Sequence, residues 1–415
     1  MTTENDPLAG LDEIDWTALE HAYGAADDVP GQLRALCGAD AGERAKALHE
    51  LYGNIFHQGS RYEASAAAVP FLARMAADAS LPDRHEALEL LAALAIGYDE
   101  AHLPGGIDIS GWRQEIAQFA AKDPEQIRAE YDTWVEEASD EGERRVREMH
   151  RAVLDVDAQL RAASAELGAY DAVRQEVPAL CVLLDDGDPA VRAATAYLLA
   201  WFPEEVGRTV PPLLRLLDRE TDQAVVATAL VAVGLLGDAE QAGKLGTFLT
   251  AGDRTVRWAA ATALARLGST DSGAAVGAEV LAELAAAEAD PPEPGPPGIL
   301  FHEGDLRGYA AASLTQLADR YPAEALDAVT DGLAATTGPA CFAVAAAALH
   351  LAFGGQRPAG LPAFADLDHR QQRLVRVLAA LDDDTWRWVN FLEILRAWGL
   401  PQDRAAMRAY AGMPA

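Results

Sequence analysis

Hydrophobic positions recur at helical spacing along most of the chain, and three segments repeat one pattern. Each segment opens with Asp, places Val three residues later, and continues with small and apolar residues three and four positions apart; the segments begin at Asp188, Asp222 and Asp253. Their starts are 34 and 31 residues apart. Self-similarity at such a period predicts an array of helix pairs, each of which buries its apolar face against the next pair.

Each position of this pattern has a physical role. The Asp is expected to cap its helix, because its carboxylate can accept from free first-turn amides. Arg192 and Arg257 follow four residues after their Asp and are expected to reach a capping Asp, whereas Val226 interrupts that series. Gly237 and Gly268 are expected to end their helices in a left-handed cap. Apolar segments with early prolines supply the other helix of each pair, at Val177–Leu184 and Val210–Leu217.

The pattern D-x-x-V-R-x-x-A-x-x-A-L-x-x-L-G resembles the HEAT repeat in its short bacterial, chromophore-lyase-like form. The clear resemblance covers Val177 to Gly268, and weaker copies start at Asp83 and Asp305. The segment Leu51–Leu72 is similar to a stretch of bacterial HEAT proteins, often actinobacterial. The resemblance implies an all-α, right-handed solenoid of stacked antiparallel helix pairs. It implies no activity, because HEAT arrays serve as scaffolds, lyases and glycosylases alike.

Two interruptions divide the expected array. HEAT-like pairs are expected over residues 1–96, followed by a loop and long charged helices over 97–170. Core repeats are expected over 171–289. A proline-rich loop over 290–304 then leads to further repeats with a polar cap over 305–415. The inserted helices are expected to break near Asp140–Gly142. Their second half predicts a coiled-coil-like seam, because its apolar residues alternate at spacings of three and four: Val146, Met149, Val153, Val156, Leu160, Ala163 and Leu167.

The composition supports helices and limits the partners. Half of the residues are apolar, aromatics make up 7%, and alanine, the best helix former, is abundant. The formal net charge of −32 disfavours nucleic acid, whose phosphates bind through clustered Lys and Arg. The same charge would attract a basic protein partner. Alternatively, the surplus carboxylates only keep an alanine-rich protein soluble.

Cysteine usage and the chain ends predict a cytoplasmic protein without a membrane segment. Cys37, Cys181 and Cys341 are odd in number, far apart and set in apolar stretches, so we expect buried, reduced thiols. The first fifteen residues lack a basic and then apolar signal-peptide pattern. The most apolar stretch, Ala340–Phe353, is shorter than the roughly 20 residues that span a bilayer.

Several side chains are candidates for chemistry, each with a structural alternative. His57, Arg61 and Tyr62, near a helix start, could receive an anion, or could form a turn that holds adjacent helices. The first loop carries Tyr98, Asp99, Glu100, His102 and Asp108, and the second ends in His302, Glu303 and Asp305; these residue types could ligate a metal or act as acids and bases, but loop carboxylates are also common helix caps.

No established catalytic or metal-ligand spacing is present in the sequence. We therefore predict no catalytic residue, no cofactor and no metal, and treat nine residues as candidates for partner binding. Trp258 is included because aromatic residues dominate interface hot spots, although a repeat Trp more often fills the core. The nine are His57, Arg61, Tyr62, Tyr98, Asp99, His102, Trp258, His302 and Glu303.

The leading functional hypothesis is a non-enzymatic scaffold, adaptor or inhibitor, for example an immunity-type protein. It would hold a protein partner, basic in character, against an acidic concave face lined by the second helix of each pair. One alternative is a small-molecule lyase or modifying enzyme, similar to the HEAT-type chromophore lyases, with a pocket under the loops. Another is nucleic-acid binding similar to the HEAT-fold glycosylases, which the charge disfavours.

Overall fold

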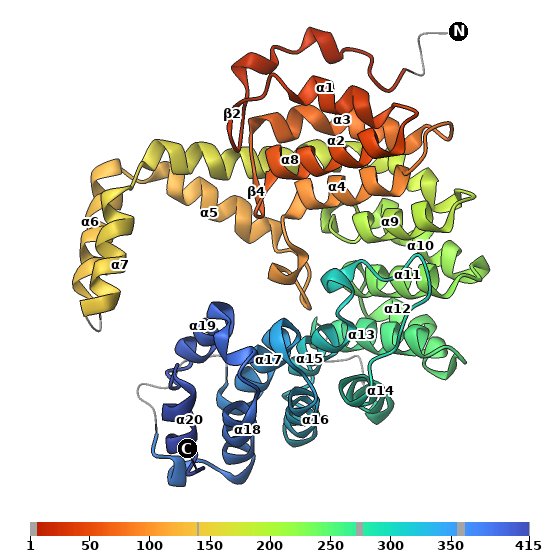
Figure 1. The fold of residues 1–415 in the computed structure, drawn as a ribbon. Coiled ribbons are helices and arrows are strands. Elements are labelled where there is room, and N and C mark those ends of the chain that lie inside the picture. The colour runs from red at the N-terminus through yellow and green to blue at the C-terminus, as the bar shows by residue number, and fades with distance from the viewer. Residues whose placement is uncertain (1–5, 139–140, 271–276, 355–361, 415) are drawn as a thin grey trace. The chain divides into compact units, whose positions relative to one another are not determined.

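The computed structural model describes residues 6–138, 141–270, 277–354 and 362–414. In these residues the chain forms twenty α-helices and two antiparallel two-stranded sheets (Figure 1). The predicted all-α fold is confirmed. The described chain divides into two compact units: one comprises Met1–Tyr98 and Ile107–Leu180, and the other Asp99–Gly106 and Cys181–Ala415.

Unit 1 combines helix pairs with two short β-hairpins. Its helices are α1 Val29–Leu36, α2 Ala41–Asn54, α3 Glu63–Ala77, α4 Arg84–Ile96, α5 Ile109–Ala121, α6 Pro124–Glu136, α7 Glu141–Ala152 and α8 Val156–Leu180. Its strands are β1 Glu20–His21, β2 Gly24–Ala25, β3 Phe56–His57 and β4 Ser60–Arg61. β1 pairs with β2 and β3 with β4, in the registers Glu20↔Ala25 and Phe56↔Arg61. Helix α3 packs against both α4 and α8, and α1 packs against α2.

The inserted segment contains a helical hairpin, but the predicted continuous seam is wrong. Helices α6 and α7 pack on each other beyond the end of α5 (Figure 1). Helix α7 stops at Ala152, and the Asp155 carboxylate accepts from the Ala158 amide, so α8 starts as a separate helix. This break interrupts the stripe, and Val146, Met149 and Val153 are exposed.

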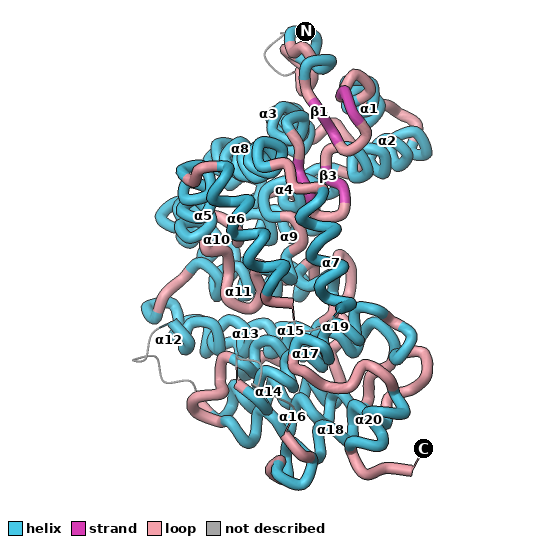
Figure 2. Tube along the Cα trace, turned by 90° about the vertical axis from the view of Figure 1, so that its left-hand side faces the viewer, coloured by secondary structure: helices cyan, strands magenta, loops and turns pink. Residues whose placement is uncertain are grey.

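Unit 2 is a stack of helix pairs in two rows (Figures 1 and 2). One row, called the capped row after the Asp caps of its first four helices, contains α9 Pro189–Leu199, α11 Gln223–Leu236, α13 Arg254–Thr270, α15 Leu306–Thr315, α17 Cys341–Phe353 and α19 Val389–Ala397. Each of these helices packs on the next. The outer row contains α10 Val206–Arg219, α12 Ala239–Gly246, α14 Ala278–Ala289, α16 Pro322–Ala334, α18 His369–Ala380 and α20 Arg404–Tyr410. Each apolar face is therefore buried by a neighbouring pair, as the repeat predicts.

The Asp residues of the repeat cap their helices, with one exception. Asp188, Asp222, Asp253 and Asp305 each accept from first-turn amides. Asp83 does not: its φ is +55°, and no amide of α4 reaches its side chain. Its carboxylate instead accepts from Arg44, so an ion pair replaces the predicted cap.

The repeat arginines do not reach the capping Asp, which corrects the prediction. Arg192 donates to the Asp186 carbonyl and pairs with Glu220, 2.7 Å away. Arg257 likewise donates to the Ala251 carbonyl and pairs with Glu283. We call this arrangement the repeat clamp: an Arg four residues after a capping Asp binds a carbonyl before the cap and a carboxylate of another helix.

Unit 1 contains a third repeat clamp that the sequence pattern did not reveal. Asp40 caps α2, and Arg44, four residues later, donates to the Gly38 and Ala39 carbonyls and pairs with Asp83. The Val of the motif is absent here, because Glu43 occupies its position. The clamp is therefore present even where the Val of the repeat motif is replaced.

The glycines act differently from the prediction. Gly237 ends α11 in extended backbone, with φ −80° and ψ −178°, and Gly268 lies inside α13, so neither forms a left-handed cap. Gly234 explains how closely α11 and α13 pack. A Cβ at Gly234 would lie 2.5 Å from the Cα of Ala263, closer than packed atoms approach.

The three cysteines are free thiols, as expected, but only Cys341 is buried; Cys37 and Cys181 are half-buried. Burial raises the pKa of all three thiols, that of Cys341 to about 12. Within the described part of the chain, no helix has both the length and the hydrophobicity needed to cross a membrane.

Candidate functional site

The two loops singled out by the sequence meet in unit 2 at the Asp99 carboxylate. Asp99 opens a short 3-10 helix, Asp99–Ala101, and is only 5% exposed. Its Oδ2 accepts from the Tyr197 hydroxyl at 3.2 Å and from the His302 amide at 2.9 Å. Asp99 and His302 are 203 residues apart in sequence. Asp99 therefore joins the loop 99–106 to helix α9 and to the end of the proline-rich loop.

Aromatic rings surround this carboxylate. The Phe301 ring lies 4.8 Å from Tyr197, 5.7 Å from Trp201 and 6.3 Å from Tyr309, measured between centroids. Burial raises the pKa of Asp99 to about 6, because this surrounding penalises the charged form more than the two hydrogen bonds favour it. The site thus holds a carboxyl group that changes its protonation near neutral pH.

The backbone beside Asp99 is strained. His302 and Glu303 adopt left-handed conformations with φ of +56° and +51°, and Gly304 follows with +79°. For residues other than glycine this conformation costs about 1 kcal/mol or more each. The His302 ring stacks on Tyr309 at 6.2 Å, and its buried Nδ1 has no hydrogen-bond partner. Such strain and unsatisfied polarity are typical of functional sites, so this junction is the first candidate site.

The remaining candidates of unit 2 differ in position. The His102 ring lies 6.2 Å from Trp201, at the edge of the same aromatic group. Glu303 is exposed. Trp258 is only 1% exposed, and its indole donates to the Leu306 carbonyl. Trp258 therefore fills the core between α13 and α15 and offers no surface to a partner.

In unit 1, Arg61 connects several elements. Its guanidinium is buried, lies 3.5 Å from Glu166 of α8, and sits 5.8 Å from the centre of the Trp112 ring of α5. It also donates to the Gly59 carbonyl. Burial lowers the pKa of Arg61. These contacts agree with the structural alternative considered for Arg61, because a carboxylate of the same unit already occupies the position of an anion.

The other unit 1 candidates lie around the β3–β4 hairpin. The Tyr23 ring lies 5.4 Å from His57, and Tyr98 lies 5.5 Å from Phe56. Tyr62 is close enough to Tyr23 and Glu166 that both raise the pKa of its hydroxyl, after the larger effect of burial. We call Tyr23, His57, Tyr62 and Tyr98 the tyrosine patch.

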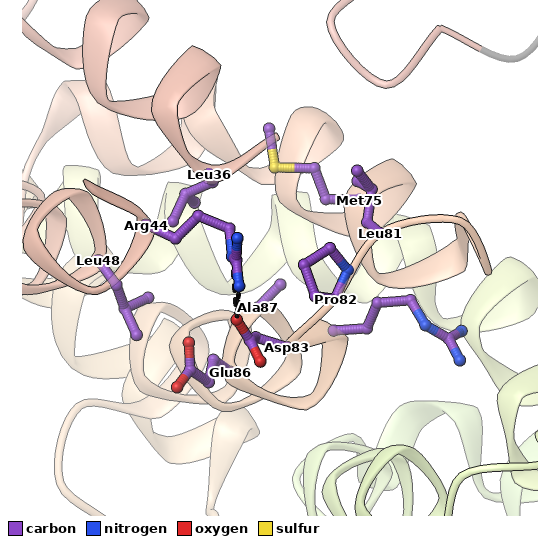
Figure 3. A pocket seen from close by; sticks show the side chains of 10 residues that line it. Leu36, Arg44, Leu48, Met75, Leu81, Pro82, Asp83, Glu86 and Ala87 are labelled. Carbon is purple, nitrogen blue, oxygen red and sulfur yellow. Dashed lines mark hydrogen bonds and ion pairs between the residues drawn. The ribbon is translucent and has the colours of Figure 1, made fainter. Parts of the chain in front are cut away.

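Two other places in the fold, a small cavity and a buried carboxyl group, are too enclosed to serve as binding sites. A cavity between α2 and α4 contains the Arg44–Asp83 clamp (Figure 3) and holds about 20 Å³, roughly the space for one water molecule. Glu288 is fully buried, its carboxylate oxygens lack hydrogen-bond partners, and Gly332 leaves room for it. Burial raises the pKa of Glu288 well above its usual range. Neither place is open enough for a metabolite.

Sequence reasoning missed Tyr23 and Tyr197 among the residues of these sites. Tyr197 occupies an ordinary helical position of the first repeat, and only the fold brings its hydroxyl to Asp99. Tyr23 lies between two-residue strands that are too short for a periodic signal. Among the described residues, no cluster of three or more His, Cys, Asp or Glu side chains is arranged to hold a metal ion.

Carboxylates are distributed unequally among helices α9 to α17 of unit 2. Helices α9, α11, α13, α15 and α17 contain no Asp or Glu. Helices α10, α12, α14 and α16 carry Asp218, Glu240, Glu279, Glu283, Glu288, Glu324, Asp327 and Asp331. The difference does not continue to the end of the unit, because α18 and α20 carry no carboxylate and α19 carries Glu393.

Comparison with known proteins gives a partial match. The family model described as HEAT repeats matches residues 210–293. No curated protein matches the chain. Among solved structures, the chain is similar to an engineered protein at 19% identity, over 93% of this chain and 97% of that one, but a TM-score of 0.29 is too low for this likeness to bear on the fold. The family match, on the stacked helix pairs of unit 2, shows that the chain contains HEAT repeats.

Proposed function

We propose that this protein is a non-catalytic scaffold, adaptor or inhibitor that binds a protein partner. The observation that supports it is the array of stacked HEAT pairs, which presents long rows of helices to a partner. The fold alone does not assign a function, so the proposal also rests on three exposed aromatic residues, Tyr23, Tyr98 and Trp388.

The partner is proposed to be basic. The sequence has 65 acidic and 33 basic residues, and helices α10, α12, α14 and α16 of unit 2 carry several of the carboxylates. Long-range attraction would speed the encounter with a positively charged protein. A basic cytotoxic effector neutralised by an immunity-type inhibitor is one such partner. Nucleic acid carries the opposite charge to this partner and would be repelled.

Affinity capture from the source organism tests the proposal. The tagged full chain is expected to recover one protein in stoichiometric amount, and a native mass spectrum should show the complex. The association rate should fall steeply as salt rises, because screening shortens electrostatic attraction. Repeated recovery of the bare chain would contradict the scaffold function, and a salt-independent rate would contradict a basic partner.

A second candidate function is a small-molecule enzyme with its site at Asp99 and His302. The buried carboxyl group and the strained turn 302–304 favour it. A native mass spectrum of the purified chain should then show a bound metabolite that Asp99→Asn loses. Spectra without added mass, for the wild type and the variant alike, would speak against this enzyme.

A further inference from the structure

Two exposed tyrosines flank one β-hairpin in unit 1. Tyr23 is 70% exposed and Tyr98 is 47% exposed. Tyr23 lies against His57 of β3, and Tyr98 lies against Phe56 and the turn at Gly59. Exposed rings in contact with a hairpin are held in place, because each loses part of its rotational freedom to that contact. The exposed parts of both rings therefore lie beside one hairpin.

The turn and the side-chain contacts of this hairpin restrict its conformation. Gln58 and Gly59 form its two-residue turn with φ of +51° and +87°. A Cβ at Gly59 would lie 3.0 Å from the Tyr98 ring, so only glycine allows the ring to rest on the turn. Arg61 fixes the other end of the hairpin through Glu166 and Trp112. A prearranged surface loses little entropy when a partner binds.

Exposed carboxylates lie on the elements that adjoin the patch. Glu20 on β1 and Glu63 at the start of α3 are exposed, and Glu166 is partly exposed. Arg61, the cation of the hairpin itself, is buried and already lies beside Glu166. An approaching group therefore meets aromatic faces and carboxylates together. This combination attracts a cation, because the face of a tyrosine ring is electronegative.

We propose that the tyrosine patch binds lysine and arginine side chains of a basic segment in the protein partner. The proposal rests on the scaffold function and names the surface and the residue chemistry that this function would use. A second copy of this chain does not fit the patch equally well, because each copy carries a net charge of −32. A phosphorylated or acidic segment would be repelled by the same carboxylates.

A fluorescent peptide of about ten residues, alternating arginine and glycine, tests the patch with the full chain. Binding is measured by fluorescence anisotropy at about 150 mM NaCl, where long-range attraction is largely screened. Tyr23→Ala and Tyr98→Ala should each weaken binding roughly two- to fivefold, the expected contribution of an exposed cation–π contact. Tyr23→Phe and Tyr98→Phe should retain binding, because phenylalanine keeps the aromatic face.

Trp388→Ala is the matched control, since Trp388 is an exposed aromatic residue of unit 2. Its variant should bind the peptide like the wild type.

Equal binding by all variants would show attraction by net charge alone and overturn the proposal. Absence of binding by the wild type would also overturn it. If a captured partner binds Tyr23→Ala and Tyr98→Ala undiminished, the patch is wrong while the scaffold function stands. If no partner is captured but the peptide responds as expected, the scaffold function alone fails. Circular dichroism checks that each variant is folded.

Discussion

At the scale of single residues, Asp99 links protonation to folding. An unfolded Asp has a pKa of about 3.9, and burial raises that of the folded group to about 6. The native state therefore holds more protons than the unfolded state between these values. The contribution of Asp99 to the free energy of unfolding is fully present below a pH of about 4. It falls by roughly 2 to 3 kcal/mol as the pH rises through 6.

Asp99→Asn should remove this pH dependence, because asparagine keeps an acceptor for Tyr197 or His302 without a titratable group. Relative to the wild type, the variant should gain about 2 kcal/mol of unfolding free energy between pH 4.5 and pH 7.5. Urea unfolding at several pH values measures the difference, and Glu303→Gln, an exposed carboxyl on the adjoining loop, is the control. A difference between Asp99→Asn and the wild type that stays constant with pH would refute the assignment.

At the scale of the element, the repeat clamp makes each capped helix depend on another helix. The Arg192 guanidinium binds both oxygens of Glu220, at 2.7 and 3.1 Å, and the Glu220 side chain is almost fully buried. Hydrogen bonds from Arg192 and two backbone amides lower the pKa of Glu220 despite the opposing effect of burial. The clamp thus pairs the Glu220 carboxylate with a cation, and without this partner the buried charge would destabilise the fold.

Arg192→Ala should destabilise the protein by about 3 kcal/mol, because it leaves the Glu220 charge without its partner. The double variant Arg192→Ala with Glu220→Gln should lose less than the sum of the two single changes, since the two side chains interact directly. Denaturant unfolding of the four proteins in this cycle gives the coupling energy. Arg254→Ala breaks an exposed pair with Asp290 and should cost less than about 1 kcal/mol. Additive single effects would show that the clamp contributes nothing as a pair.

At the scale of the whole molecule, the net charge of −32 opposes the folded state. Like charges repel most strongly when the chain is compact. Local ion pairs such as the clamps reduce this repulsion only where an arginine is available, and acidic residues outnumber basic ones by 65 to 33. The surplus therefore lies on the surface, where dissolved ions can screen it.

Raising NaCl from about 20 to about 200 mM should increase the melting temperature by roughly 1 to 3 °C, because screening shortens the range of this repulsion. Differential scanning calorimetry measures the shift, and sucrose of equal osmolality controls for a general solute effect. A melting temperature that falls with salt would mean that attractive ion pairs outweigh the repulsion.

Local patterns along the chain were enough to predict the helices, most of their Asp caps and the repeat. Asp188, Asp222 and Asp253 are local signals, because an N-cap needs only its own first turn, and apolar residues at helical spacing must face a neighbouring helix. Both loops were also recognisable, because proline and glycine exclude regular helix over 290–304. The short β-hairpins and the break between α7 and α8 were missed, since two-residue strands and a single capping Asp155 leave no periodic signal.

Packing across the fold determines which distant groups meet. It brought Asp99 to Tyr197 and His302, turned the repeat arginines toward Glu220 and Glu283 instead of the capping Asp, and buried Trp258 while exposing Tyr23. These outcomes depend on pairing between helices far apart in sequence, and such pairing is fixed by burial and close packing across the whole stack, which no local pattern encodes.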